Sequence, residues 1–372
     1  MTGDATSKAL RHARNAKAAA REAPPPKTLE AIGFVDAASA IRAWPGYAPT
    51  PLVQPPGLAE ELRLEALYVK DEGQRLGLKS FKALGGAYAV QRLVATAKGP
   101  VTVTCATDGN HGRAVAWGAR SFGAKAVIYM PEFVSPGRAA AIEALGAEVR
   151  RAPGNYDEIV RQVAIDAKQN GWHVVSDTSY AGYTDAPRQV MYGYGVMAEE
   201  CIAAFKGEPP THVLAQAGVG ALAAALCARF WIEWGPRRPR FLTVEPETAD
   251  CVFASIEEGK PATVTGDLAT VMGGLSCGEV SKLAWEVLRT GVDDALAIGD
   301  SWAIDAMRML ARATPPVIAG ETGGAGLGAL IALAEAPNLK RHLDLTPDSR
   351  VLVINSEGDT DPAIYREIVG AS

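Results

Sequence analysis

One stretch decides the fold: VTVTCATDGNHGRAVAWGARSFGAKAVIYM, residues 101–130. Its first four residues, VTVT, and its last six, KAVIYM, are short β-branched and apolar runs of the kind that form buried strands. The segment between them, NHGRAVAWGARSFG, has the length of a helix and ends at Gly123. Two strands joined by a helix of this length form a βαβ unit, so the stretch predicts parallel strands.

The same alternation of strands and helices continues on both sides of this stretch. Further strand-like runs are LYVKDE (67–72), AEVRRA (147–152), WHVVS (172–176), THVLAQ (211–216), RFLTVE (240–245) and SRVLVIN (349–355). Most of them are separated by helical segments, which predicts an α/β protein with a mainly parallel sheet. A chain of 372 residues is long enough to form two lobes rather than one.

Composition excludes several classes of partner. The chain is 48% hydrophobic with a net charge of −5 and no long basic run, so we expect no nucleic-acid partner. No apolar run approaches the roughly 18 residues of a membrane span. The five cysteines lack C-x-x-C spacing, which argues against a metal site and favours a cytoplasmic enzyme with reduced thiols. We interpret the basic, Ala-rich residues 1–28 as a partly helical N-terminal arm.

The first loop with chemical potential is GLKSFKALGGAYAV, residues 77–90. Lys82 falls in the first turn of a helix that begins near Ser80. The positive end of the helix dipole and burial both disfavour an ammonium there, and a partly neutral lysine can attack a carbonyl. The alternative is a solvated surface lysine, a role that suits Lys79 better.

The second loop is QAGVGALAAAL, residues 216–226, directly after a predicted strand. Gly218 and Gly220 allow close approach of a ligand to the backbone, and the following helix presents unpaired N–H groups. The run lacks the Lys-Ser/Thr pair of a nucleotide-binding loop, so it suits one phosphate monoester better than a triphosphate. The alternative is a tight strand–helix turn.

The third loop is TDGNHGRAVAW, residues 107–117. The loop N–H groups, the Thr107 hydroxyl and the Asn110 amide would bind a small carboxylate, with Asp108 as an acid or base beside it; helix capping is the alternative. Asp177 lies in another loop that would line a cleft. After the last predicted strand, either Asn355 or Ser356 would meet a buried ring nitrogen.

A reactive lysine, a monophosphate loop and a carboxylate loop together indicate pyridoxal phosphate acting on an amino acid. The motifs SFKALGG, TDGNHGR, LGAEVRRAPGNYDE, QAGVGA and INSEGDTD occur in the order found in fold-type II pyridoxal-phosphate enzymes, the tryptophan synthase β-like group. The chain therefore resembles this family from about Gly46 to Tyr365. Within it, KDEGQRLGLKSFKALGGAYAV, DTSYAGYTDAP and GGLSCGE most resemble diaminopropionate ammonia-lyases.

The resemblance implies a two-domain architecture, each domain a mostly parallel twisted sheet flanked by helices. Beyond the arm, it implies a large cofactor-binding domain from residues 29–85 and 190–372 and a smaller substrate-loop domain from residues 86–189. It also implies a homodimer.

The resemblance further implies roles for individual residues. Lys82 would form the Schiff base with the cofactor, and Asn110 would lie near the cofactor's 3-hydroxyl. Asp108 matches an acid that serves the D-enantiomer, and Asp177 an acid near the substrate's amino groups. The implied phosphate loop is Gly218, Val219, Gly220 and Ala221, and the implied substrate contacts are Thr107, Asp108, Gly109, His111 and Tyr156. Cys251 and Cys277 match a pair that can form a disulfide, although free thiols are expected in a reducing cytoplasm.

The activity implied is α,β-elimination of one or both enantiomers of 2,3-diaminopropionate to pyruvate and ammonia. The alternative is a dehydratase of serine, threonine, 3-hydroxyaspartate or a bulkier 3-hydroxy amino acid on the same fold. Two departures leave the substrate open: LKSFK stands where those lyases have a more neutral LNAFK-like run, and the connection to residue 101 is short. A requirement for a monovalent cation also stays open. A non-catalytic binding protein is a third possibility, against which the context of Lys82 argues.

Overall fold

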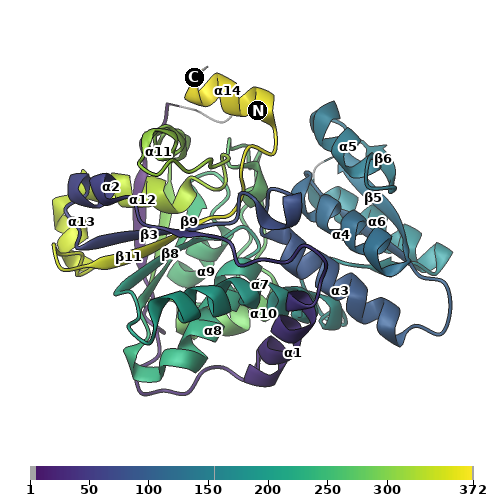
Figure 1. The fold of residues 1–372 in the computed structure, drawn as a ribbon, viewed down its shortest axis with the longest axis horizontal. Coiled ribbons are helices and arrows are strands. Elements are labelled where there is room, and N and C mark those ends of the chain that lie inside the picture. Colours follow the sequence, from purple (N-terminus) through teal and green to yellow (C-terminus); the bar gives the residue numbers. More distant parts are fainter. Residues whose placement is uncertain (1–5, 155, 371–372) are drawn as a thin grey trace.

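The computed structural model describes residues 6–154 and 156–370, and it contains two sheets flanked by helices (Figure 1). The larger sheet has seven strands. From edge to edge they are β1 (Leu10–Arg14), β10 (Asp294–Ile298), β9 (Arg240–Pro246), β8 (His212–Gln216), β11 (Arg350–Asn355), β3 (Ala66–Asp71) and β2 (Leu52–Val53). The five central strands are parallel, and only the edge strands β1 and β2 pair antiparallel.

The smaller sheet has four parallel strands in the order β6-β5-β4-β7. Their bounds are β6 (Glu148–Ala152), β5 (Lys125–Pro131), β4 (Thr102–Ala106) and β7 (His173–Val174). β4 and β5 are joined by helix α4 (Asn110–Phe122), which confirms the βαβ unit predicted for residues 101–130. The α/β class with mostly parallel sheets is confirmed as well.

The helices cover both faces of the large sheet and surround the small one (Figure 1). The remaining α-helices are α1 (Ala31–Arg42), α2 (Pro56–Glu61), α3 (Lys82–Thr96), α5 (Pro136–Glu143), α6 (Tyr156–Asn170), α7 (Asp185–Phe205), α8 (Ala221–Trp234), α9 (Cys251–Glu258), α10 (Lys282–Gly291), α11 (Asp300–Arg312), α12 (Ala325–Ala334), α13 (Pro337–His342) and α14 (Pro362–Val369). Three short 3₁₀ turns are η1 (Arg75–Gly77), η2 (Gly235–Arg237) and η3 (Gly273–Leu275). Over the described residues, none of these helices combines the length and the apolar character needed to cross a membrane.

The central strands are buried on both faces, as β11 illustrates. Leu352 and Ile354 belong to a core cluster that also contains apolar residues of α7, α8 and α10. Val351 and Val353 point to the opposite face and join a second cluster with residues of α11 and α12. Successive side chains of a strand alternate between faces, so a strand covered by helices on both sides must be apolar throughout.

The expectation of a partly helical N-terminal arm is wrong for residues 10–14. This segment forms β1 and pairs antiparallel with β10, with Leu10 opposite Ile298 and Arg14 opposite Asp294. Its basic and Ala-rich composition favours a helix in isolation, but pairing with the exposed edge of β10 satisfies its backbone groups as a strand.

The two sheets support the division that we propose for the rest of the chain. All four strands of the small sheet lie between residues 102 and 174, inside the proposed smaller domain 86–189. Strands β3, β8 and β4 each end where one of the three candidate loops begins. Since carboxyl ends of parallel strands share an edge, these loops can meet.

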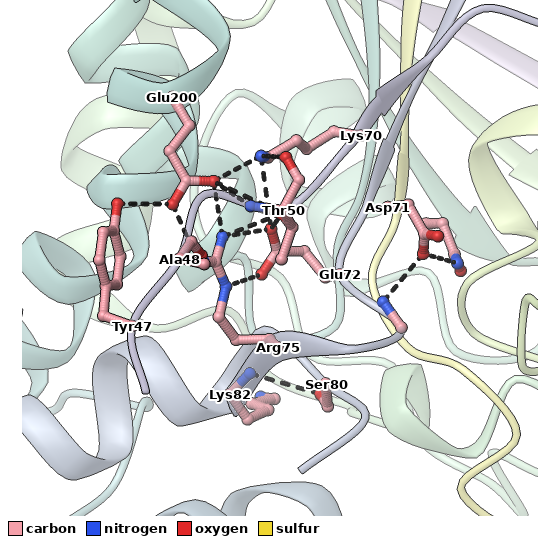
Figure 2. A network of polar contacts seen from close by, with 12 residues as sticks. Tyr47, Ala48, Thr50, Lys70, Asp71, Glu72, Arg75, Ser80, Lys82 and Glu200 are labelled. Carbon is pink, nitrogen blue, oxygen red and sulfur yellow. Dashed lines mark hydrogen bonds and ion pairs between the residues drawn. The ribbon is translucent and has the colours of Figure 1, made fainter. Parts of the chain in front are cut away.

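A buried network of charges lies at the entry to α3 (Figure 2). Arg75 donates through Nε to Glu72 Oε2 at 2.7 Å and through Nη2 to Glu72 Oε1 and Glu200 Oε2, both at 2.7 Å. Lys70 also donates to Glu200, which comes from α7. Burial opposes ionisation of Glu200, but Arg75 and Lys70 outweigh it and lower the pKa of Glu200. The network therefore ties the loop that carries Lys82 to α7.

We expect Glu200→Ala to lower the free energy of unfolding by about 3–5 kcal/mol, because it leaves two buried cations with one carboxylate. Urea unfolding at pH 7 measures the loss. Since the pKa of Glu200 is lowered in the folded state, its contribution is present above the ordinary value of 4.5 and disappears as the pH falls through the folded value. Glu258→Ala, at the exposed end of α9, is the control and should change stability by less than about 0.5 kcal/mol. Equal losses in the two variants would contradict the role of the network.

Candidate active site

A cavity of about 940 Å³, part of it open to solvent, lies where the three candidate loops meet. Most of the residues selected from the sequence line this one cavity. They are Lys82, Thr107, Asp108, Gly109, Asn110, His111, Asp177, Gly218, Val219, Gly220, Ala221 and Ser356. Segments separated by more than 270 residues in the chain therefore meet at a single site.

Lys82 is the first residue of α3, and its Nζ forms an ion pair with Asp177. The ammonium also lies 5.3 Å from the ring centroid of Phe81 and 5.9 Å from that of Tyr194. Burial would raise the pKa of Asp177, but the Lys82 charge and hydrogen bond lower it to about 2. Asp177 therefore carries a negative charge beside the lysine, in a pocket whose other walls are aromatic.

The loop after β4 is shaped by the Thr107 hydroxyl. Its oxygen accepts hydrogen bonds from the N–H groups of Gly109 at 2.9 Å and Gly112 at 3.0 Å, which leaves the hydroxyl hydrogen free for another acceptor. Gly109 has a φ of +145°, a conformation that favours glycine. Burial raises the pKa of the neighbouring Asp108 to about 6, although the Arg138 and Lys82 charges oppose the rise. This loop therefore combines hydrogen-bond donors with a carboxyl that titrates near neutral pH.

His111 is a buried, neutral side chain of the cavity wall. Its Nε2 lies 2.8 Å from the Val175 carbonyl oxygen, so Nε2 carries the hydrogen and Nδ1 is an acceptor. Nδ1 is buried without a hydrogen-bond partner. Burial lowers the pKa of His111, which favours the neutral ring.

The glycine loop between β8 and α8 forms a narrow cradle. A Cβ on Gly218 would lie 3.2 Å from Gly274 O, Leu275 Cα and Cys277 Sγ, and Gly220 has a φ of +88°. α8 begins at Ala221, so its first N–H groups lack partners within the helix. Such a cradle suits a compact anion with several acceptor oxygens, such as a phosphate monoester.

Two candidates for the ring-nitrogen contact are oriented differently. Asn355 Nδ2 donates to Asp71 Oδ1 at 2.8 Å and to Ile318 O at 3.0 Å, which turns its amide nitrogen toward β3. Ser356 lines the cavity, and its Oγ is buried without a hydrogen-bond partner. Tyr156 begins α6, and its side chain lies outside the described part of the structure.

Four cavity residues were not selected from the sequence: Arg138, Glu321, Thr322 and Glu357. Glu357 Oε2 accepts from Asn110 Nδ2, and its Oε1 accepts from the Thr322 N–H at 3.1 Å. Glu357 lies inside the motif INSEGDTD, so the signal was available. Glu321 precedes a glycine-rich run before α12, a weaker signal, and nothing local distinguishes Arg138 from other helix arginines.

Two thiols lie beside the glycine cradle. Cys251 Sγ donates to the Gly218 carbonyl at 3.4 Å, and Cys277 lines the cavity next to the same glycine. Both are free thiols, and burial raises the pKa of Cys251.

Comparison with known proteins identifies relatives along most of the chain. Residues 43–357 match a family model described as pyridoxal-phosphate dependent enzyme. Diaminopropionate ammonia-lyase from Escherichia coli (strain K12) is 42% identical over 349 residues, covering 87% of this chain and 88% of the relative.

Solved structures show the same similarity. The crystal structure of the Escherichia coli diaminopropionate ammonia-lyase with D-serine has a TM-score of 0.91 and 37% identity, covering 98% of this chain and 97% of that one. The structure of that enzyme with an aminoacrylate–PLP azomethine reaction intermediate has a TM-score of 0.91, 38% identity and the same coverage.

Proposed function

The chain belongs to the pyridoxal-phosphate-dependent enzymes and, among them, to the diaminopropionate ammonia-lyases, and on this premise we propose that it converts 2,3-diaminopropionate to pyruvate and ammonia. It is a carbon–nitrogen lyase that uses pyridoxal 5'-phosphate. The observation that carries the proposal is the grouping of Lys82, Asp108 and Asp177 in one cavity with the glycine cradle. The cavity thus has the groups for proton transfer beside a site for a phosphate.

The residues present fit the cofactor. The narrow cradle at Gly218 fits its phosphate, and the buried, unpartnered Ser356 Oγ fits its ring nitrogen. We propose that Lys82 Nζ holds it covalently, that Gly218, Val219, Gly220 and Ala221 bind its phosphate, that Asn110 contacts its 3-hydroxyl and that Ser356 contacts its ring nitrogen. When bound, pyridoxal phosphate is an electron sink that stabilises the negative charge left when Cα loses its proton.

The protein's own groups would bind the substrate and move protons. The Thr107 hydroxyl and the loop N–H groups up to His111 are donors for the substrate carboxylate. Lys82 Nζ would take the Cα proton of the L-substrate, and Asp108 that of the D-substrate. Both groups line the cavity but come from different elements, as two bases on one carbon require.

Asp177 would hold the proton that the leaving amine receives. The charge of Lys82 is what keeps its pKa near 2, against burial that raises it. Once Lys82 is neutral, only burial and the weaker partners act, so the pKa of Asp177 rises and it can keep a proton. A proton can therefore pass between Lys82 and Asp177 as the charge of the lysine changes.

The proposal is tested by pyruvate formation from D- and L-2,3-diaminopropionate, measured beside D- and L-serine and L-threo-3-hydroxyaspartate. We expect both diaminopropionate enantiomers to be consumed faster than any hydroxy amino acid, because the site places two carboxyls where a second ammonium would lie. Faster consumption of a hydroxy amino acid, with negligible turnover of diaminopropionate, would make the chain a dehydratase.

We also propose that the enzyme is a cytoplasmic homodimer. All five cysteines are free, as a reducing compartment would leave them. α1 exposes Ile32 and Val35, at 62% and 57% of their surface, which suits contact with a second copy. Light scattering of the purified enzyme and fractionation of the source cells test the two statements, and a monomer would refute the first.

A further inference from the structure

Arg138 connects the two sides of the active-site cavity. It lies on α5, which follows β5 of the small sheet, and its side chain reaches the cavity. Its Nη1 donates to the Asp108 carbonyl oxygen at 3.4 Å, and its Nη2 lies 3.9 Å from Glu321 Oε1. Glu321 lies just before α12, which packs on the large sheet. One guanidinium thus bridges the Asp108 loop and the opposite wall.

The Asp108 loop passes directly beneath this side chain. A Cβ on Gly109 would lie 3.3 Å from Arg138 Cδ, so the arginine stem packs on the loop backbone. Gly109 has a φ of +145°, and the loop therefore depends on its surroundings to keep this conformation. Removing the arginine side chain would free the loop on its cavity side.

A second contact fixes the start of the same helix. Ser135, the N-cap of α5, donates from its hydroxyl to Asp361 Oδ2 at 3.0 Å. Asp361 in turn caps α14, with its other oxygen accepting from the Ala363 N–H at 3.2 Å. Arg138 is therefore held at a defined height above the cavity rather than by its own weak contacts alone.

Glu321 is suited to hold the other end of the bridge. Its side chain is 5% exposed, and its Oε1 has no hydrogen-bond partner. Burial and the neighbouring Glu357 raise the pKa of Glu321 to about 7, while Arg138 opposes the rise. Nearby cationic charge is thus what keeps this carboxyl partly ionised.

We propose that Arg138 is a positioning residue: by bridging the Asp108 carbonyl and the Glu321 carboxylate, it holds the Asp108 loop in place for proton transfer. The proposal rests on the function proposed above, in which Asp108 serves the D-substrate. It adds a residue from a part of the sequence that carries no recognisable motif.

Arg138 also contributes to the charge balance around Asp108. The cations that face Asp108 are Lys82, at the start of α3, and Arg138, on α5, and both hold down the pKa that burial raises. The other titratable side chains that line the cavity are His111, Asp177, Cys277, Glu321 and Glu357. Removing the Arg138 charge should therefore raise the pH at which Asp108 becomes a base.

The test compares Arg138→Gln and Arg138→Lys in the holoenzyme, with Arg161→Gln on the exposed side of α6 as the control. With D-diaminopropionate, we expect Arg138→Gln to lower kcat/KM about tenfold and to shift its acidic limb upward by about 0.5–1 pH unit. Arg138→Lys should keep the limb near that of the wild type but not the full kcat/KM, because an ammonium keeps the charge but not the fork geometry.

Two further measurements separate positioning from a merely structural role. Hydrogen exchange of a peptide spanning residues 105–113 should be at least about threefold faster in Arg138→Gln than in the control. Glu321→Gln combined with Arg138→Gln should lower kcat/KM less than the product of the single effects, by a factor of about 2 or more.

An unchanged acidic limb together with unchanged exchange in Arg138→Gln would overturn the proposal. So would a lower melting temperature and lower cofactor content with a normal limb, which would indicate a structural role only. If the wild type does not turn over diaminopropionate, the proposed function is wrong. The exchange data alone then decide whether Arg138 positions the loop.

Discussion

Lys82→Ala should abolish covalent attachment of the cofactor and lower pyruvate formation by on the order of 10³-fold or more. Lys82 Nζ reaches the cavity from the first residue of α3 and faces Asp177, so no substitute amine occupies its place when the side chain is shortened. Alanine also removes the group that would take the Cα proton of the L-substrate. Both effects act on the same step, which is why this is the largest loss that we expect.

The measurement is borohydride reduction of the purified holoenzyme followed by peptide mass analysis. In the wild type, the reduced adduct should map to the peptide that contains Lys82. Lys79→Ala is a matched control three residues away. Lys79 also lies in this loop, but its Nζ pairs with Asp359 Oδ1 at 2.8 Å, away from Asp177. A reducible lysine adduct retained in Lys82→Ala, or lost in Lys79→Ala, would contradict the assignment.

Asp108→Asn should separate the two enantiomers. We expect kcat with D-diaminopropionate to fall by about 10²–10⁴-fold, the usual contribution of a general base, while turnover of the L-enantiomer changes much less. Asparagine keeps the shape of the side chain and cannot accept the proton. Asp348→Asn, on an exposed loop before β11, is the control and should leave both rates near those of the wild type.

The pH dependence gives this prediction a second check. Because burial raises the pKa of Asp108 to about 6, the carboxyl is mostly protonated at pH 5 and mostly ionised at pH 7. The D-specific rate of the wild type should therefore rise with pH through this range, and the rise should be absent from the residual rate of Asp108→Asn. Equal losses with both enantiomers would refute the assignment of two separate bases.

Much of the site could be predicted because its motifs are continuous in the chain. The loop of Thr107 to His111 and the loop of Gly218 to Ala221 each follow a strand and precede a helix, and both line the cavity. Their chemistry depends on backbone N–H groups and glycine conformations, which are local properties. The helical start at Lys82 was predictable for the same reason.

Contacts between distant segments were not predictable in this way. Arg138 and Glu321 are 183 residues apart, and neither stands in a motif that suggests the other. The choice between Asn355 and Ser356 depends on which side chain β3 engages, and the aspartate of β3 bonds the Asn355 amide. Strand β1 is a strand because the edge of β10 is open to it, although its own residues favour a helix.

The sequence by itself determined the parallel α/β fold, the cofactor class and the loops that surround the cavity. Periodicity and turn chemistry act over a few residues, and a single chain records them fully. The tertiary structure alone decided which charges meet: the pairing of Lys82 with Asp177, the raised pKa of Asp108 and the bridge made by Arg138. These depend on burial and on distances between elements, because an electrostatic interaction is set by the separation of two groups in space and not along the chain.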